Sequence, residues 1–413
     1  MASDLATDLR VLRREEWNEW YDTLIRAFGG VPESSEEREL WNSLTEIDRS
    51  LAVWDGDACV GTAGAFSFRL TVPGGASVRA AGVTMVSVAA THRRRGLLTA
   101  MMRRQLDDVR EWGWPLAVLT ASEPAIYGRF GYGAGTFNAG AEIDTQRVRL
   151  SVPPGTDDVR LRYAKPAEVL AACEAVYARV VPERPGMLAR TPGWERLMLL
   201  DPESDRDGAS PLQCVVAERD GEVVGYTRFR VKPDWEPTGP QGKVILRDLE
   251  ALDPETYAAL WRFLFDIDLT STLVTGVRPV DDAWQYLVSD IRRCSLRVRD
   301  SLHVRLVEVG AALEARTYQA PVDVVFEVSD EFCPWNAGRW RLSGDAKGAS
   351  CERTTDAADL SLSVRELGSA YLGGVSLAGL AAAGRVRELR RGALGEAAVG
   401  FGSAVAPWLP HGF

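Results

Sequence analysis

A short basic run after an apolar segment is the part of this sequence best suited to hold an anionic ligand. Val86-Ser87-Val88 has the character of a strand, and Arg93-Arg94-Arg95-Gly96 follows as a tight turn before a helical pattern. The first amides of a helix have no partner within the helix, and the helix dipole favours an anion there. We therefore expect a pyrophosphate-binding turn, as a coenzyme A thioester would require.

Acetyl transfer from a thioester needs a pyrophosphate grip, a polariser for the carbonyl, a base for the incoming amine and an acid for the leaving thiolate. The turn and the first helical residues are candidates for the grip: Arg94, Arg95, Gly96, Leu97, Leu98 and Thr99. The two arginines would add charge-assisted hydrogen bonds. A solvent-exposed basic turn is the plainer alternative, because charged turns before helices are common.

The strand that precedes the turn is the candidate polariser. The backbone of Val86, Ser87 and Val88 could pair with the amides of a pantetheine arm. If this strand diverged from its neighbour, free N–H groups would face the thioester carbonyl. An ordinary central strand fits the same residues, so the sequence leaves both arrangements open.

A candidate acid follows the next expected strand, Leu116–Thr120. Ser122 could cap a short helix and Glu123 would favour the dipole at its start. Tyr127 comes about one turn later, and a phenol with a pKa of about 10 stays protonated at neutral pH and could protonate a thiolate. A half-buried packing role is the alternative for Tyr127, and Tyr132 is the competing phenol nearby.

The end of the chain offers a candidate base. Ala404–Phe413 is apolar and aromatic, which predicts a docked tail because frayed tails are usually polar. Docking would desolvate the α-carboxylate of Phe413, raise its pKa from about 3.5 and make it a better base. The alternative is a carboxylate paired with an arginine. His92 lies inside the anion turn and is interpreted as structural.

Two stretches share one pattern, an apolar strand, an Asp-Gly turn and a second strand that carries Val-Gly. They are Leu51–Thr62 and Cys214–Tyr226. Asp-Gly between apolar runs predicts a hairpin. Each copy precedes another strand and an amphipathic helix, namely Gly82–Val88 with Leu97–Trp112 and Lys243–Leu249 with Thr256–Phe265. The second copy has Asp253-Pro254 where the first has its arginines. We predict two related α+β domains, the second degenerate, although Asp-Gly hairpins also recur by chance.

Loop composition predicts the domain boundaries. Ser151–Asp158 is a candidate linker, and Lys232–Pro240 is an expected long hairpin loop inside the second domain. The pattern changes again near Ile291. We expect domains at 1–150, 151–292 and 293–413, the third of mixed α/β type with a shallow apolar groove.

Composition limits the remaining possibilities. The 413 residues carry a net charge of −10, which argues against nucleic acid as a partner and is compatible with a cationic substrate. Six scattered cysteines and three histidines predict reduced thiols in a cytoplasm and no metal site. We see neither a secretory signal nor a membrane span.

Together, Val86–Val88, His92–Leu98 and Ser122–Gly133 closely resemble the Eis-type N-acetyltransferases, three-domain members of the GCN5-related acetyltransferase (GNAT) superfamily. The resemblance extends through Ala311–Arg316 and Leu367–Gly373 to the aromatic last residue. The general superfamily pattern has glycine or alanine where Leu98 stands, and the Eis-like set tolerates leucine there.

The resemblance implies two tandem GNAT-like domains, the second degenerate, and a sterol-carrier-like third domain. It implies acetyl-CoA bound by Val86–Val88, Arg94–Thr99 and Ser122 with Glu123, Tyr127 as general acid and the Phe413 carboxylate as general base. It also implies amine acceptors of the aminoglycoside, polyamine or lysine type, and a homohexamer built from two trimers. A non-catalytic acyl-CoA or lipid-binding protein that uses the groove of the third domain is the alternative.

Overall fold

The computed structural model describes residues 7–237 and 239–413, and the chain divides into two compact units. The first contains the described residues up to Thr136, together with Leu302–Ala404 and Phe413. The second contains Phe137–Ser301 and Val405–Gly412. The chain therefore crosses between the units more than once, and the last residue belongs to the first unit.

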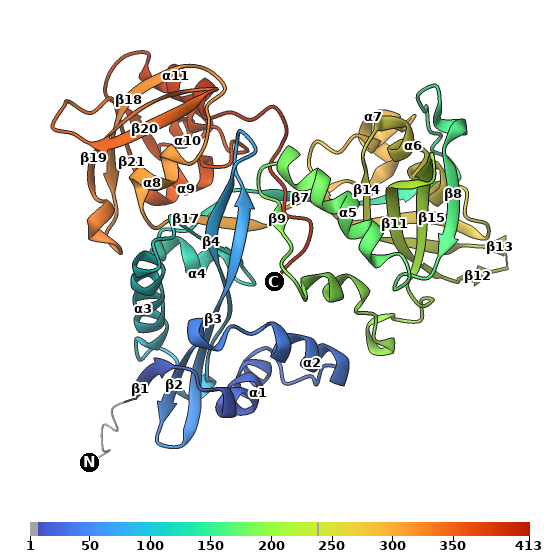
Figure 1. Cartoon of the computed structure of the whole chain (residues 1–413), viewed down its shortest axis with the longest axis horizontal. Helices are drawn as coiled ribbons and strands as arrows, with labels where there is room; N and C mark the ends of the chain where they lie inside the picture. The colour runs from blue at the N-terminus through green and yellow to red at the C-terminus, as the bar shows by residue number, and fades with distance from the viewer. Residues whose placement is uncertain (1–6, 238) are drawn as a thin grey trace. The chain divides into compact units, whose positions relative to one another are not determined.

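The first unit is built on a mixed sheet with the strand order β1-β2-β3-β4-β5-β17-β6 (Figure 1). The strands are β1 (Asp8–Val11), β2 (Leu51–Asp55), β3 (Ala58–Thr71), β4 (Ser77–Val88), β5 (Leu116–Thr120), β6 (Gly133–Ala134) and β17 (Leu302–Leu306). Neighbours pair antiparallel except β4 and β5, which are parallel and are joined through α3 (Leu97–Glu111). A parallel pair needs such a crossover helix.

Helices cover both faces of this sheet (Figure 1). On one face, α1 (Trp17–Ala27) packs Trp17 and Trp20 against Ala52 and Trp54, and α2 (Ser35–Leu44) follows it in the chain. On the other face, Met101 of α3 packs in a cluster with Leu51 and Val53. The alternation along β2 places these residues on opposite faces, as expected of a strand in a two-sided core.

Both Asp-Gly turns form the predicted hairpins. Gly56 connects β2 to β3 with a φ of 60°. In the second copy, Asp220 and Gly221 have φ values of 53° and 83°, and they join β10 (Gln213–Arg219) to β11 (Glu222–Lys232). Positive φ at both central positions explains why this turn carries Asp-Gly.

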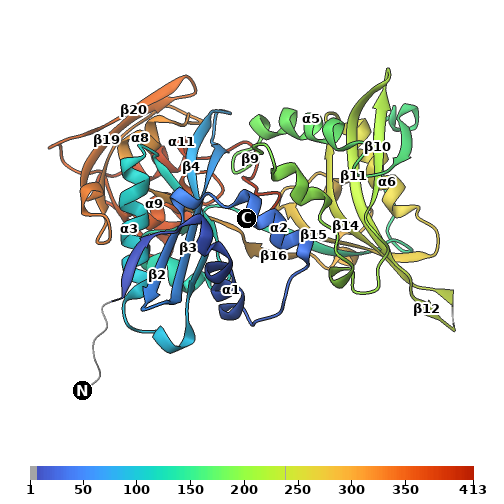
Figure 2. The ribbon, with the colours of Figure 1, turned by 60° about the horizontal axis from the view of Figure 1, so that its bottom comes forward.

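The second unit repeats the layout of the first, as the sequence repeat predicts. Its sheet has the order β16-β7-β15-β14-β11-β10-β8, with one parallel pair, β14 and β15, joined through α6 (Pro254–Phe265). The other strands are β7 (Phe137–Asp144), β8 (Arg160–Ala164), β14 (Gly242–Ala251), β15 (Thr270–Pro279) and β16 (Arg297–Asp300). Figure 2 shows α5 (Leu170–Val180) and α6 on the two sides of this sheet.

In each of these two sheets, the strand that pairs with the second strand of the parallel pair comes from a distant part of the chain. β7, which precedes the second repeat, pairs with β15, and β17, which follows it, pairs with β5.

The predicted linker 151–158 lies within the second unit rather than before it. The ranges 1–150, 151–292 and 293–413 stay a prediction for the three domains. The expected hairpin at 232–240 is present as β12 (Trp235–Glu236) and β13 (Gly239–Pro240).

The C-terminal part of the first unit has its own sheet, in the order β20-β19-β18-β21-β22. Its elements are α8 (Val309–Glu314), β18 (Val322–Ser329), β19 (Gly338–Asp345), β20 (Gly348–Arg353), β21 (Leu360–Ser363), α9 (Val364–Ala370), α10 (Leu377–Ala382), β22 (Val386–Glu388) and α11 (Ala393–Gly400). Helix α9 packs closely on β17, since a β-carbon on Gly368 would lie 2.4 Å from the carbonyl oxygen of Val304. Arg305 of β17 forms a buried ion pair with Asp330 at 2.6 Å.

All six cysteines are free and buried, consistent with packing roles. Among the described residues, no cluster of histidine, cysteine and carboxylate side chains could hold a metal ion. None of the helices in the same residues is long and apolar enough to cross a membrane.

Candidate active site

Strand β4, which contains the predicted cofactor-binding residues Val86–Val88, diverges from its neighbour β5. Their parallel pairing runs from Ala80 with Leu116 to Gly82 with Val118, although β4 continues to Val88. Beyond Gly82, the edge of β4 that faced β5 is therefore free of ladder hydrogen bonds to that strand. The sequence left two arrangements open, a strand that diverges from its neighbour and an ordinary central strand. The structure has the diverging strand.

A bulge in β4 turns its backbone at the same place. The register between β3 and β4 shifts after Thr62, so Met85 and Val86 face no partner on β3, and Met85 has a φ of 51°. The Thr62 hydroxyl donates to the Met85 carbonyl at 2.7 Å and is also 2.7 Å from the Ser87 hydroxyl. These side-chain bonds hold the bulge, which re-aims the backbone amides of Val86–Val88.

The arginine turn leads into a helix whose N-terminus is open. Gly96 is the N-cap of α3 with a φ of 83°, no side chain caps the helix, and its first turn has no acidic residue. Arg94 also has a positive φ, of 62°. A backbone that alternates between left-handed and right-handed conformations in this way points successive N–H groups toward one concave site, which can bind an anion. In the described part of the chain, the exposed side chains of Arg93, Arg94 and Arg95 have no hydrogen-bonding or ion-pair partner.

This geometry fits the pyrophosphate of a coenzyme. The amides of Leu97, Leu98 and Thr99 lie at the uncapped end, where N–H groups of a helix lack internal partners. Leu97 is buried in the core and Leu98 packs against it, so their side chains anchor the helix start. Backbone amides and the exposed arginine side chains are then left for the anion.

The corresponding helix of the second unit is closed to an anion. The Asp253 carboxylate caps α6, accepting hydrogen bonds from the Thr256 amide at 2.8 Å and from its hydroxyl at 2.9 Å. Arg219 contacts the same carboxylate at 3.2 Å. A negative charge thus already occupies the position that a phosphate would take, which agrees with the prediction of a degenerate second copy.

Tyr127 lies at the end of α4 (Pro124–Tyr127), directly after β5. Its ring is half-buried against the core, with its centroid 6.1 Å from that of Tyr132. Burial, and secondarily the Glu123 charge, raises the pKa of Tyr127. Within the described residues its hydroxyl has no hydrogen-bond partner. The phenol is therefore protonated at neutral pH and free to donate.

The predicted cap at the start of this helix is wrong. Pro124 occupies the first helical position, which places Glu123 at the N-cap, and no side chain bonds to the helix amides. Ser122 and Glu123 are both exposed instead. Tyr132, the competing phenol, is fully buried with an unpartnered hydroxyl, and burial raises its pKa strongly. Access to a substrate favours Tyr127.

The last residue docks on the first unit. The ring centroids of Phe413 and Phe68 are 4.8 Å apart in an edge-to-face arrangement. Phe68 lies on β3 and pairs with Ala80 of β4. The sequence predicts a docked tail, but gives no signal that would have identified Phe68 as its contact.

His92 has partners on both ring nitrogens. Its Nε2 atom lies 2.9 Å from an Asp55 carboxylate oxygen, and its Nδ1 atom lies 2.8 Å from the Thr91 hydroxyl. These contacts tie the start of the arginine turn to the first Asp-Gly hairpin. They match the structural role expected from the sequence.

The arginine turn and Tyr127 follow two neighbouring strands at the same edge of the sheet. The arginine turn follows the carboxyl end of β4, and Tyr127 follows the carboxyl end of β5. Carboxyl ends of adjacent parallel strands share an edge, and that edge is where these two strands separate. This edge carries the uncapped start of α3, the part of β4 that is not paired with β5, and the Tyr127 phenol.

Family models match three parts of the chain. An acetyltransferase (GNAT) domain matches residues 8–135, a second acetyltransferase (GNAT) domain matches 186–306, and a sterol carrier protein domain matches 309–410. N-acetyltransferase Eis of Mycobacterium tuberculosis is 34% identical over 369 residues, covering 85% of this chain and 86% of the relative. The chain belongs to the Eis-type N-acetyltransferases of the GNAT superfamily. Its fold is the predicted α+β class, with two tandem GNAT domains and a C-terminal sterol-carrier-like domain.

Other similar proteins agree with this assignment. A relative from Streptomyces avermitilis named an uncharacterized N-acetyltransferase is 80% identical over 409 residues, covering 99% of this chain and 100% of the relative. The crystal structure of Eis1 from Mycobacterium abscessus is 35% identical with a TM-score of 0.84, covering 99% of this chain and 100% of that one. The protein is accordingly an acyltransferase, and GNAT acetyltransferases use acetyl-CoA as cosubstrate.

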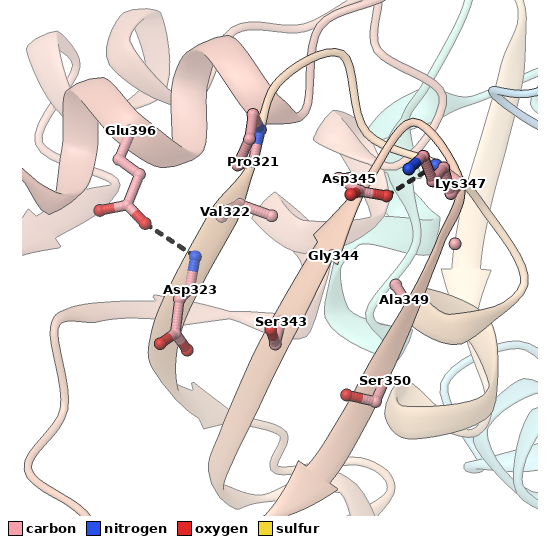
Figure 3. Close-up of a pocket in the computed structure, with 11 residues that line it drawn as sticks. Pro321, Val322, Asp323, Ser343, Gly344, Asp345, Lys347, Ala349, Ser350 and Glu396 are labelled. Carbon is pink, nitrogen blue, oxygen red and sulfur yellow. Dashed lines mark hydrogen bonds between the residues drawn. The ribbon is translucent and has the colours of Figure 1, made fainter.

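The sterol-carrier-like domain has a surface hollow, and the shallow apolar groove expected in this domain stays a prediction. The hollow lies at one end of β18, β19 and β20, and most of its side chains are small or polar (Figure 3). Asp323, Ser343, Asp345, Lys347, Ser350 and Glu396 are among its lining residues. The Asp323 amide donates to the Glu396 carboxylate at 2.7 Å. This lining does not favour a lipid chain.

Proposed function

We propose that this protein transfers the acetyl group of acetyl-CoA to a primary amine in a ternary complex, without an acetylated enzyme intermediate. The observation that carries the proposal is the divergence of β4 from β5 after Gly82 and Val118, beside the uncapped N-terminus of α3. A pantetheine arm can add to the free edge of β4 only where β5 leaves it.

In this proposal, three groups of residues bind acetyl-CoA. The amides of Leu97, Leu98 and Thr99 hold the pyrophosphate, with Arg94 and Arg95 as charged donors and Gly96 supplying the backbone turn. Val86, Ser87 and Val88 offer their backbone to the pantetheine and to the thioester carbonyl. Ser122 and Glu123, both exposed after β5, line the same edge.

Tyr127 and the Phe413 carboxylate would handle the protons. The amine nitrogen attacks the thioester carbon, so a C–N bond forms as the C–S bond breaks. The carboxylate accepts the proton that the amine loses, directly or through water, and Tyr127 gives its proton to the departing sulfur. The raised pKa of Tyr127 keeps that proton in place until the thiolate develops.

The acceptor in this proposal is a cationic amine of the aminoglycoside, polyamine or lysine type. The net charge of −10 favours such a substrate over an anionic one. By resemblance to the family we also propose a homohexamer of two trimers that acts in the cytoplasm without metal or nucleic acid.

The test is release of coenzyme A from acetyl-CoA in the presence of a panel of amines, with mass spectrometry of each amine. The proposal predicts amine-dependent thiol release together with addition of one or more acetyl groups to an amine. Release that is independent of every amine, or an acetylated enzyme that accumulates without amine, would contradict it.

A further inference from the structure

We propose that Arg305 and Asp330 are positioning residues that hold the turn carrying Tyr127, and thereby place its phenol for proton transfer. The inference rests on the proposed function, in which Tyr127 is the general acid. All three residues belong to the first unit. Asp330 follows β18 of the sterol-carrier-like domain, so this domain would support the acid of the acetyltransferase domain.

The turn that follows Tyr127 is closed by its own backbone hydrogen bonds. The Tyr132 amide donates to the Tyr127 carbonyl at 3.3 Å, and the Gly131 amide donates to the Gly128 carbonyl at 3.1 Å. The rings of Tyr127 and Tyr132 also contact each other edge to face, with centroids 6.1 Å apart. The position of Tyr127 therefore depends on where Gly131 and Tyr132 lie.

Gly131 packs directly on the Arg305 guanidinium. A β-carbon at Gly131 would lie 2.8 Å from the Arg305 Cζ and Nε atoms and 2.9 Å from Nη1, which places it over the plane of the group rather than at its edge. Gly131 also has a φ of 86°, in the left-handed region that favours glycine. The absence of a side chain at this position therefore lets the turn rest on a flat, charged surface.

Asp330 fixes the guanidinium on which the turn rests. An Arg305 Nη2 atom donates to the Asp330 carboxylate at 2.6 Å, and Nη1 donates to the Leu306 carbonyl at 3.2 Å. The Asp330 carboxylate also accepts the Cys333 amide at 2.9 Å and the Asn336 side-chain amide at 3.1 Å. Burial of an ion pair costs desolvation energy, so such a pair often adds little to stability. We therefore assign to this pair the orientation of the guanidinium.

A fixed support matters because the acid must lie within hydrogen-bonding reach of the departing sulfur. A displacement of about 1 Å can cost about 100-fold in rate. The guanidinium is flat and rigid, whereas a lysine ammonium is a point charge on a flexible stem. Arg305→Lys would therefore keep a positive charge for Asp330 and lose the surface on which Gly131 packs.

The experiment compares Arg305→Lys with wild type in two assays on the full chain. Hydrogen exchange monitored by mass spectrometry reports the peptide that contains residues 124–133, and coenzyme A release with an amine reports turnover. We expect faster exchange in this peptide and a kcat reduced about 10- to 100-fold, with an unchanged KM for acetyl-CoA. Gly131→Ala retains both members of the ion pair but pushes the turn off the guanidinium, so it should reproduce both changes.

Combination with Tyr127→Phe separates positioning from general damage to the fold. Once the phenol hydroxyl is absent its placement has no effect, so Arg305→Lys should then lower kcat by less than about twofold further. Damage to the fold would instead lower kcat by the same factor in both backgrounds. A full multiplicative loss in the double variant would therefore overturn the inference.

Arg316→Lys is the matched control, because Arg316 is an equally buried arginine of the sterol-carrier-like domain. Its guanidinium donates to the carbonyls of Thr317, Tyr371 and Phe401, which all lie outside the turn. This substitution should change neither the exchange of residues 124–133 nor kcat. Equal changes in both assays for Arg316→Lys and Arg305→Lys would show a general loss of structure and contradict the positioning role.

Two other results for Arg305→Lys would overturn that role, namely unchanged exchange in the peptide, or faster exchange with an undiminished kcat. A wild-type chain inactive toward every amine, or full activity of Tyr127→Phe, would refute the corresponding part of the proposed function and the catalytic part of this inference. The exchange data would still decide whether Arg305 holds the turn.

Discussion

Gly82 of β4 lies beside the ring of Phe413, the last residue of the sequence. A β-carbon on Gly82 would be 3.2 Å from the Phe413 ring. Gly82 is also the last residue of β4 that pairs with β5. The end of the chain thus reaches the strand at the point where it diverges, which is the place where the proposed reaction needs a base.

Gly82→Ala should disturb this junction. The added methyl group would lie 2.3 Å from the Phe68 ring, which must move and take its contact with Phe413 along. We expect a loss of about 1–3 kcal/mol in the free energy of unfolding, measured with urea, together with a lower kcat. Gly64→Ala is the control, because its methyl group would meet ordinary contacts at 3.5 Å and beyond. Equal effects of the two substitutions would contradict the assignment.

Tyr127→Phe should lower kcat about 100-fold or more, because a general acid contributes at least that factor. The ring packing against Tyr132 is retained, so the stability should change little. Calorimetry should give an unchanged Kd for acetyl-CoA. Unchanged turnover would remove Tyr127 from the mechanism.

The pH dependence of kcat should carry the signature of Tyr127. The acid must be protonated to act, and burial raises its pKa, so its proton is retained to higher pH than in a free phenol. We therefore expect the fall of kcat that follows deprotonation of Tyr127, the alkaline limb of the profile, to lie above about pH 10. Rate profiles of the wild type and Tyr127→Phe should differ in this limb, and an identical limb in both would assign it to another group.

The double substitution Arg94→Ala with Arg95→Ala should weaken acetyl-CoA binding about tenfold, since charged hydrogen bonds to the phosphates are lost. The loss should shrink at high salt because both side chains are exposed. At saturating acetyl-CoA, kcat should remain close to wild type. Arg79→Ala, at the far end of β4, provides a basic control. An unchanged Kd for acetyl-CoA in the double variant would show that the two arginines face solvent and do not bind the cofactor.

The sequence predicts local features of this fold well. The strand Leu116–Thr120 forms with the predicted limits, and both Asp-Gly turns join the predicted hairpins, because periodicity and turn chemistry depend on neighbouring residues. The predicted Ser122 cap fails for an equally local reason, the presence of Pro124.

Long-range features could not be predicted in the same way. The bulge at Met85 depends on the register of β3 against β4, and the insertion of β17 beside β5 joins segments far apart in the chain. The apolar tail indicates docking, but not against which surface. The contact between Phe413 and Phe68 therefore emerges only from the folded chain.

The most direct measurement compares the wild-type chain, Phe413→Tyr, and a chain extended by one residue after Phe413. Each is assayed for coenzyme A release from acetyl-CoA with a primary amine. Phe413→Tyr retains the terminal carboxylate and a ring, whereas the extension converts that carboxylate into an amide. Our account predicts amine-dependent release by the first two and a kcat at least about 100-fold lower in the extended chain. Full activity of the extended chain, or no amine-dependent release by the wild type, would contradict it.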